Sequence, residues 1–152
     1  MRTPRLSGFA ARVVGVAVAV LLAAGLASAF RAGAAEIVEP IRFARGASGA
    51  EVEGAVLRGE RAMYSIEARA GQRLSLRMTA VENNAVFQVY APGARPERRD
   101  YGLEILGTAL AGAAEGDDTT EWAGSLPITG GYLLVVGASR GNATYRLTIS
   151  VH

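Results

Sequence analysis

Apolar residues recur at every second position along most of the chain beyond residue 40. In ATYRLTISV (143–151) the apolar members alternate with threonine, arginine and serine, and RLSLRM (73–78) and AMYSIEA (62–68) follow the same rule. A period of two with one apolar face is typical of half-buried β-strands. The nearly continuous run YLLVV (132–136) instead predicts a central strand that is covered on both faces.

Glycine, asparagine and proline interrupt these runs about every ten residues, and they tolerate or pre-set turn conformations. Short strands at this spacing predict a sandwich or closed barrel. We expect an all-β fold, an antiparallel, jelly-roll-like β-sandwich of about eight strands, formed by a single domain over residues 36–152. The breaks that carry this turn chemistry are RGE (58–60), AGQ (70–72), ENN (82–84), APG (91–93), TGG (129–131) and RGN (140–142).

Three segments are harder to assign. EILGTALAGAAEG (104–116) has the composition of a helix, but Gly107 and Gly112 each weaken a helix by ~1 kcal/mol relative to alanine. A strand over 103–106 followed by a loop fits at least as well. The polar stretches APGARPERRDYG (91–102) and AAEGDDTTE (113–121) are expected to be the least regular parts of the domain.

Residues 1–35 have the layout of a secretory signal peptide. Three arginines precede an apolar core over 13–26, and small-residue cleavage sites follow. We expect cleavage near Ala34 or Ala35, with an uncleaved membrane anchor as the alternative. Four of the sixteen basic residues lie in this leader, so twelve remain against fourteen acids and the rest of the chain carries a formal charge of −2.

Several kinds of chemistry are excluded by composition. The chain has no cysteine and no lysine, and its one histidine, His152, is the last residue. Thiol nucleophiles, Schiff-base lysines, Ser–His pairs and metal sites built on several histidines are therefore ruled out. We expect no enzyme, no cofactor and no metal. The acidic balance without its leader also argues against nucleic-acid binding.

Two features have a functional reading and a plainer structural one. Asp117, Asp118 and Glu121 offer carboxylates to a hard cation such as Ca²⁺, but three acids do not define its cage of six to eight oxygens. A solvated loop is the preferred reading. Trp122, the only tryptophan, is expected to pack in the core, with sugar stacking as the alternative.

Several arginines could serve either to bind a partner or only to keep a surface loop soluble. Arg95, Arg98 and Arg99 interleave with two acids, so a self-compensating surface loop is favoured over an anion-binding patch. Arg140 stands beside Gly141 at the tip of a predicted hairpin between two long strands. A rigid β-scaffold is a common way to present a binding loop, and arginine is enriched at binding hot spots.

Three quoted stretches resemble a known group of bacterial modules. YSIEARAGQRLSLRM, VFQVYAPG and GSLPITGGYLLVVGASRGNATYRLTISV are similar in order and content to the pre-peptidase C-terminal β-sandwich. Within that group the chain resembles the periplasmic inhibitors of g-type (goose-type) lysozyme, over roughly residues 52–151. The resemblance implies a small exported, non-catalytic protein, periplasmic or secreted, whose partner is a g-type lysozyme.

The resemblance also assigns two partner-binding residues. The inhibitors share a pattern in which an arginine follows a strand tyrosine by eight residues, and here Arg140 follows Tyr132. This arginine is expected to reach the lysozyme cleft, and Tyr64, before the AGQ turn, matches a second contact position. From its own place on the alternating face of AMYSIEA, Tyr64 also fits a buried or half-buried tyrosine with a hydrogen-bonded hydroxyl. The segment after Arg140, GNA, is shorter than in these inhibitors. A non-inhibitory module that binds polysaccharide or another cell-envelope protein is the alternative.

Overall fold

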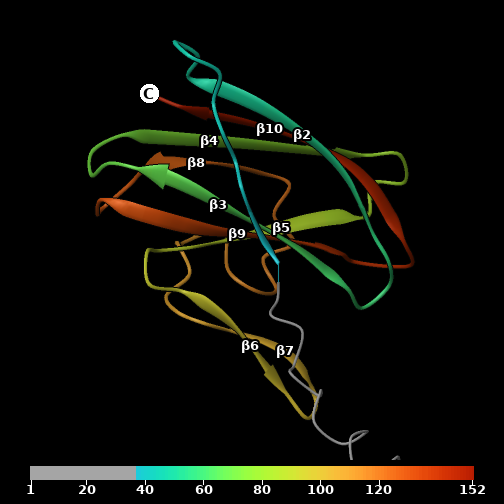
Figure 1. Cartoon of the computed structure of the whole chain (residues 1–152). Helices are drawn as coiled ribbons and strands as arrows, with labels where there is room; N and C mark the ends of the chain where they lie inside the picture. Colours follow the sequence, from blue (N-terminus) through green and yellow to red (C-terminus); the bar gives the residue numbers. More distant parts are fainter. Residues whose placement is uncertain (1–36) are drawn as a thin grey trace, which may run out of the picture. The chain divides into compact units, whose positions relative to one another are not determined.

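The computed structural model describes residues 37–152, and this part of the chain folds into ten β-strands and no helix (Figure 1). The prediction of an all-β sandwich is confirmed, with ten strands in place of about eight. The predicted signal peptide, residues 1–35, lies outside the described residues. In chain order the strands are β1 (Val38–Pro40), β2 (Gly49–Val56), β3 (Arg61–Ala68), β4 (Arg73–Ala80), β5 (Ala85–Tyr90), β6 (Arg95–Arg99), β7 (Gly102–Leu106), β8 (Glu121–Ser125), β9 (Gly130–Ala138) and β10 (Ala143–Val151).

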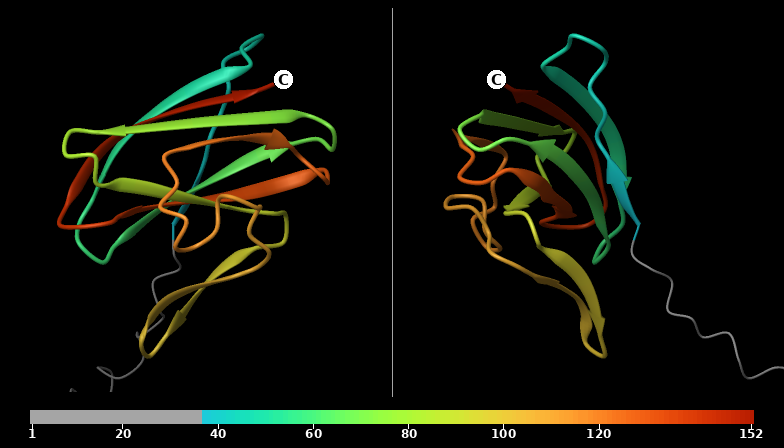
Figure 2. Two further views of the ribbon diagram at one scale, coloured as in Figure 1. Left: turned by 180° about the vertical axis from the view of Figure 1, so that it is seen from behind. Right: turned by 60° about the vertical axis from the view of Figure 1, so that its left-hand side comes forward.

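Eight of these strands form two four-stranded sheets that pack face to face (Figure 2). One sheet has the order β1-β3-β9-β5, and the other has the order β2-β10-β4-β8. All neighbouring strands are antiparallel except β1 and β3, which run parallel. β1 has only three residues and lies at the edge of its sheet. The chain then leaves that sheet, and Ile41 and Phe43 pack against the core from a loop.

The main core lies between the two sheets, and alternate residues of their longer strands make most of it. β10 is the clearest case, because Tyr145, Leu147 and Ile149 are buried while the residues between them are exposed. β9 is buried along both faces, as its continuous apolar sequence predicted. Tyr132, which begins that run, is fully buried in the core.

The outer face of β9 is covered by a hairpin formed by β6 and β7, which extends away from the sandwich (Figure 1). Leu133 and Val135 are buried there, with Leu103 and Ile105 of β7 packed against them. The strand expected over 103–106 is thus found as β7. The expectation that 91–102 is irregular was wrong for residues 95–99, because β6 gains regular backbone pairing from β7 that its charged side chains do not reveal.

Two buried tyrosines join the sheets across the core. The hydroxyl oxygens of Tyr64 on β3 and Tyr145 on β10 are 2.6 Å apart. Gly54 on β2 makes room for them, because a Cβ atom at this position would overlap the Tyr145 hydroxyl. Burial, followed by the hydrogen bond with Tyr64, raises the pKa of Tyr145 above its ordinary value. The Tyr145 hydroxyl therefore stays neutral and paired with Tyr64 inside the sandwich.

Candidate partner-binding surface

Three loops meet at one end of the sandwich, and together they carry the candidate site. They connect β2 to β3 (57–60), β4 to β5 (81–84) and β9 to β10 (139–142). All three lie at the right of Figure 1 and at the left of the reversed view in Figure 2. We call these twelve residues the loop end. Loops on a rigid β-scaffold hold binding side chains in fixed positions, because the strands anchor both ends of each loop.

Arg140 lies exposed in the β9–β10 loop, as the hairpin prediction placed it. Its side chain bends over the β4–β5 turn, where Nη2 donates a hydrogen bond of 2.7 Å to the backbone oxygen of Glu82. Gly141 follows with a φ of +59°, a conformation that glycine adopts without steric cost. One side of the guanidinium is therefore held by the neighbouring turn, and its other donors face solvent.

Asn84, in the β4–β5 turn, anchors the β9–β10 loop through hydrogen bonds. Its side chain is only 1% exposed, and its Nδ2 donates to the backbone oxygens of Arg140 at 3.0 Å and Asn142 at 2.8 Å. The Asn142 side-chain oxygen in turn accepts a 2.9 Å hydrogen bond from the backbone N–H of Arg58. The β9–β10 loop is thus hydrogen-bonded to both of the other loops. Sequence reasoning read Asn84 only as a turn residue, because its partners lie more than fifty residues away.

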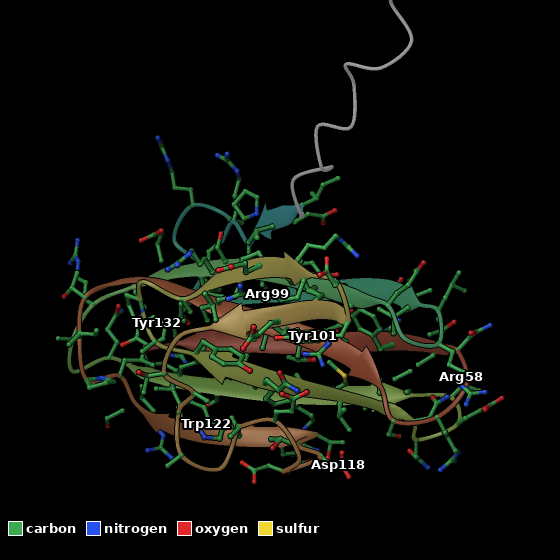
Figure 3. All side chains as sticks on the ribbon, turned by 90° about the horizontal axis from the view of Figure 1, so that it is seen from below. Arg58, Arg99, Tyr101, Asp118, Trp122 and Tyr132 are labelled. Carbon is green, nitrogen blue, oxygen red and sulfur yellow. The ribbon has the colours of Figure 1, made fainter. Side chains whose placement is uncertain are left out.

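The side chains that the loop end presents to solvent are both cationic and apolar. Val81 is 90% exposed and Leu57 is 54% exposed. Arg58, which Figure 3 labels, and Arg140 are also exposed, and within residues 37–152 neither forms an ion pair. By contrast, five other arginines are ion-paired to glutamates: Arg61, Arg77, Arg95, Arg99 and Arg146.

Tyr64 does not join Arg140 at the loop end. It is 6% exposed, and its ring belongs to the core cluster between the sheets. A side chain with so little exposed surface has almost nothing to offer a partner protein. We therefore assign Tyr64 to the packing of the core and leave it out of the contact proposed below.

The other candidate groups have structural roles. The Asp117 carboxylate accepts a 2.8 Å hydrogen bond from the backbone N–H of Ala114, within the loop between β7 and β8. Across residues 37–152, no three acidic or histidine side chains are grouped so that they would hold a metal ion. Arg99 lies between two glutamates, at 2.9 Å from Glu97 and 3.1 Å from Glu104, as a self-compensating arrangement requires.

Trp122 belongs to the edge strand β8 and is partly buried (Figure 3). Its indole N–H donates a 3.0 Å hydrogen bond to the backbone oxygen of Ala111, and its ring packs against the core. The expectation of core packing is confirmed. No helix within the described residues is long and apolar enough to cross a membrane.

Comparisons with known proteins bear on this site. Neither protein-family models nor curated proteins match the sequence. Among solved structures, the chain is similar to the Aeromonas hydrophila PliG, a periplasmic inhibitor of g-type lysozyme, with 29% identity and a TM-score of 0.56 over 76% of this chain and 96% of that one. The Salmonella Typhimurium PliG is 19% identical with a TM-score of 0.52, covering 76% of this chain and 97% of that one. A PliG mutant from Escherichia coli is 20% identical, also with a TM-score of 0.52 and the same two coverages, 76% and 97%.

These likenesses confirm the resemblance to g-type lysozyme inhibitors. The Salmonella and Escherichia proteins share the fold, and the Aeromonas protein adds a closer sequence likeness over almost its whole length. All three neighbours are inhibitors and not enzymes.

Proposed function

We propose that this chain is an exported, non-catalytic protein that inhibits a goose-type lysozyme. The observation that carries the proposal is the 29% identity with an inhibitor of this enzyme class over 96% of that inhibitor's length. The signal peptide that the sequence predicts over residues 1–35 supports export, and the periplasmic location of the three neighbours supports that compartment.

In the proposed mechanism the loop end enters the substrate cleft of the enzyme and blocks it without any chemistry. Arg140 then pairs with the catalytic carboxylate of the lysozyme. Arginine suits this role because its planar fork matches a carboxylate in two parallel hydrogen bonds. Two features of the free protein support this role, namely the exposure of Arg140 and its position on hydrogen-bonded loops.

The proposal is tested by adding the purified protein to g-, c- and i-type lysozymes and measuring lysis of a peptidoglycan suspension. We expect the g-type enzyme to be inhibited at a concentration that leaves the other two types active. Equal activity of all three enzymes in the presence of excess protein would contradict the proposal.

A pull-down on insoluble peptidoglycan separates inhibition from the alternative, a module that binds polysaccharide. An open groove of about 410 Å³ on the outer face of the β2-β10-β4-β8 sheet offers a place for such binding. Ser75, Thr148 and Ser150 line it, together with Trp122. Capture by peptidoglycan without inhibition of any lysozyme would favour that alternative.

A further inference from the structure

We infer that the contact with the enzyme extends beyond Arg140 to the whole loop end, with Val81 and Arg58 as further partner-binding residues. The inference rests on the proposed function and refines it. It states which chemistry the enzyme must offer, namely a carboxylate-lined cleft with an apolar wall beside it. Neither residue is distinguished by the sequence pattern, because both stand in turns where solvated side chains are usual.

Val81 lies next to the residue that the Arg140 side chain contacts. The guanidinium of Arg140 is hydrogen-bonded to Glu82, the residue that follows Val81, and the turn itself is closed by a 3.1 Å hydrogen bond from the Asn83 N–H to the Ala80 oxygen. A partner that reaches the free side of Arg140 therefore also meets the β4–β5 turn. Val81 is the most exposed large hydrophobic residue there, and burying a valine corresponds to about tenfold to hundredfold in affinity.

Arg58 supplies a second cation from the β2–β3 loop, which is bonded to the β9–β10 loop independently of the β4–β5 turn. Its backbone N–H is bonded to the Asn142 side chain, so its own side chain begins next to that loop. It has no ion-pair partner within residues 37–152, so no such pair must be broken before it meets a carboxylate. Leu57, its neighbour in sequence, adds a second partly exposed apolar side chain.

The hydrogen bonds of Asn84 and Asn142 fix this surface before the partner arrives. Binding then does not have to order three separate loops, and the entropy cost of association is smaller. Glu60 and Glu82 lie in the same loops, so the loop end carries negative as well as positive charge. A carboxylate of the partner is therefore favoured opposite Arg58 or Arg140 and disfavoured opposite either glutamate. The contact thus selects partners by where their acidic side chains lie.

The test compares inhibition constants for g-type lysozyme between loop-end variants and matched variants at the opposite end. Val81→Ala is expected to weaken inhibition about tenfold, and Val81→Asp to weaken it about a hundredfold or more. Ile128→Asp is the matched control, because Ile128 is 47% exposed in the β8–β9 loop, which is bonded to the β3–β4 turn at the other end. This control is expected to change inhibition less than twofold.

Arg58→Ala is expected to weaken inhibition about tenfold at low salt and less at high salt, since screening reduces an exposed charge–charge contact. Arg69→Ala, in the β3–β4 turn, is its control. All of these positions are exposed, so thermal unfolding should match that of the unchanged protein.

The outcomes separate the inference from the function on which it rests. If Arg140→Ala impairs inhibition while the Val81 and Arg58 variants behave like their controls, the extended contact is overturned and the inhibitor function stands. If the unchanged protein inhibits no g-type lysozyme, both are overturned. Loss of inhibition at the loop end alone, with normal unfolding, supports both.

Discussion

Replacing Arg140 with alanine is expected to weaken inhibition of g-type lysozyme by about thirtyfold to several thousandfold. Removing one member of a desolvated, hydrogen-bonded charge pair at an interface typically costs ~2–5 kcal/mol, and each 1.36 kcal/mol is tenfold. Folding should be nearly unaffected, because within residues 37–152 this side chain makes only an exposed hydrogen bond, to the backbone oxygen of Glu82.

Arg140→Lys refines this experiment, because lysine keeps the charge but loses the planar fork. Its inhibition is expected to fall between the unchanged protein and Arg140→Ala. The measurement is the inhibition constant by titration, with thermal unfolding recorded for each variant and Arg69→Ala as the control. An Arg140→Ala protein that inhibits as strongly as this control would remove Arg140 from the contact.

The strands could be predicted from the sequence wherever the pattern is local. β10 and β4 alternate so regularly that one face had to be buried, and β9 is apolar enough to be buried on both. The charged segment 95–99 shows no such pattern. Its strand exists because residues 102–106 lie beside it and pack on the outer face of β9, and no local pattern records that contact.

The candidate site was accessible from the sequence only in part. Arg140 could be placed at an exposed tip because Gly141 and the two flanking strands define the hairpin. The role of Asn84 could not be found, because its hydrogen bonds reach residues 56 and 58 positions away. The partner of the Tyr64 hydroxyl likewise could not be identified, because Tyr145 lies 81 residues further along the chain. Side-chain pairing across a sandwich joins segments that the sequence separates.

The Tyr64–Tyr145 pair gives the second large effect, this time on stability. Tyr64→Phe and Tyr145→Phe are each expected to lower the free energy of unfolding by ~1–3 kcal/mol, because each leaves the other hydroxyl buried without its partner. The double variant should cost clearly less than the sum of the two, because replacing both hydroxyls leaves no polar group unpaired. Denaturant unfolding of the four proteins measures this, and strictly additive losses would contradict a direct pair.

The unfolding free energy of the same variants should also differ in its dependence on pH. The pKa of Tyr145 is raised in the folded protein, so its contribution to stability is complete below about pH 10, the ordinary tyrosine value, and is lost as the pH rises beyond it. Tyr145→Phe removes this contribution, and its unfolding free energy should fall less steeply above pH 10 than that of the unchanged protein. An equally steep fall would show that Tyr145 ionises as easily in the folded chain as in the unfolded one.

Inhibition by Tyr64→Phe then decides between the two roles of this residue. The sequence resemblance assigns Tyr64 to the contact with lysozyme, whereas its burial assigns it to the core. A core role predicts an unchanged inhibition constant once the concentration is corrected for the folded fraction. Weaker inhibition by fully folded protein would mean that the Tyr64 hydroxyl contributes to binding. It would do so either directly, by becoming exposed to the partner, or indirectly, by holding the loop end in place through Tyr145. Since β10 begins directly after the Arg140 loop, the second route would be distinguished by an equal loss in Tyr145→Phe.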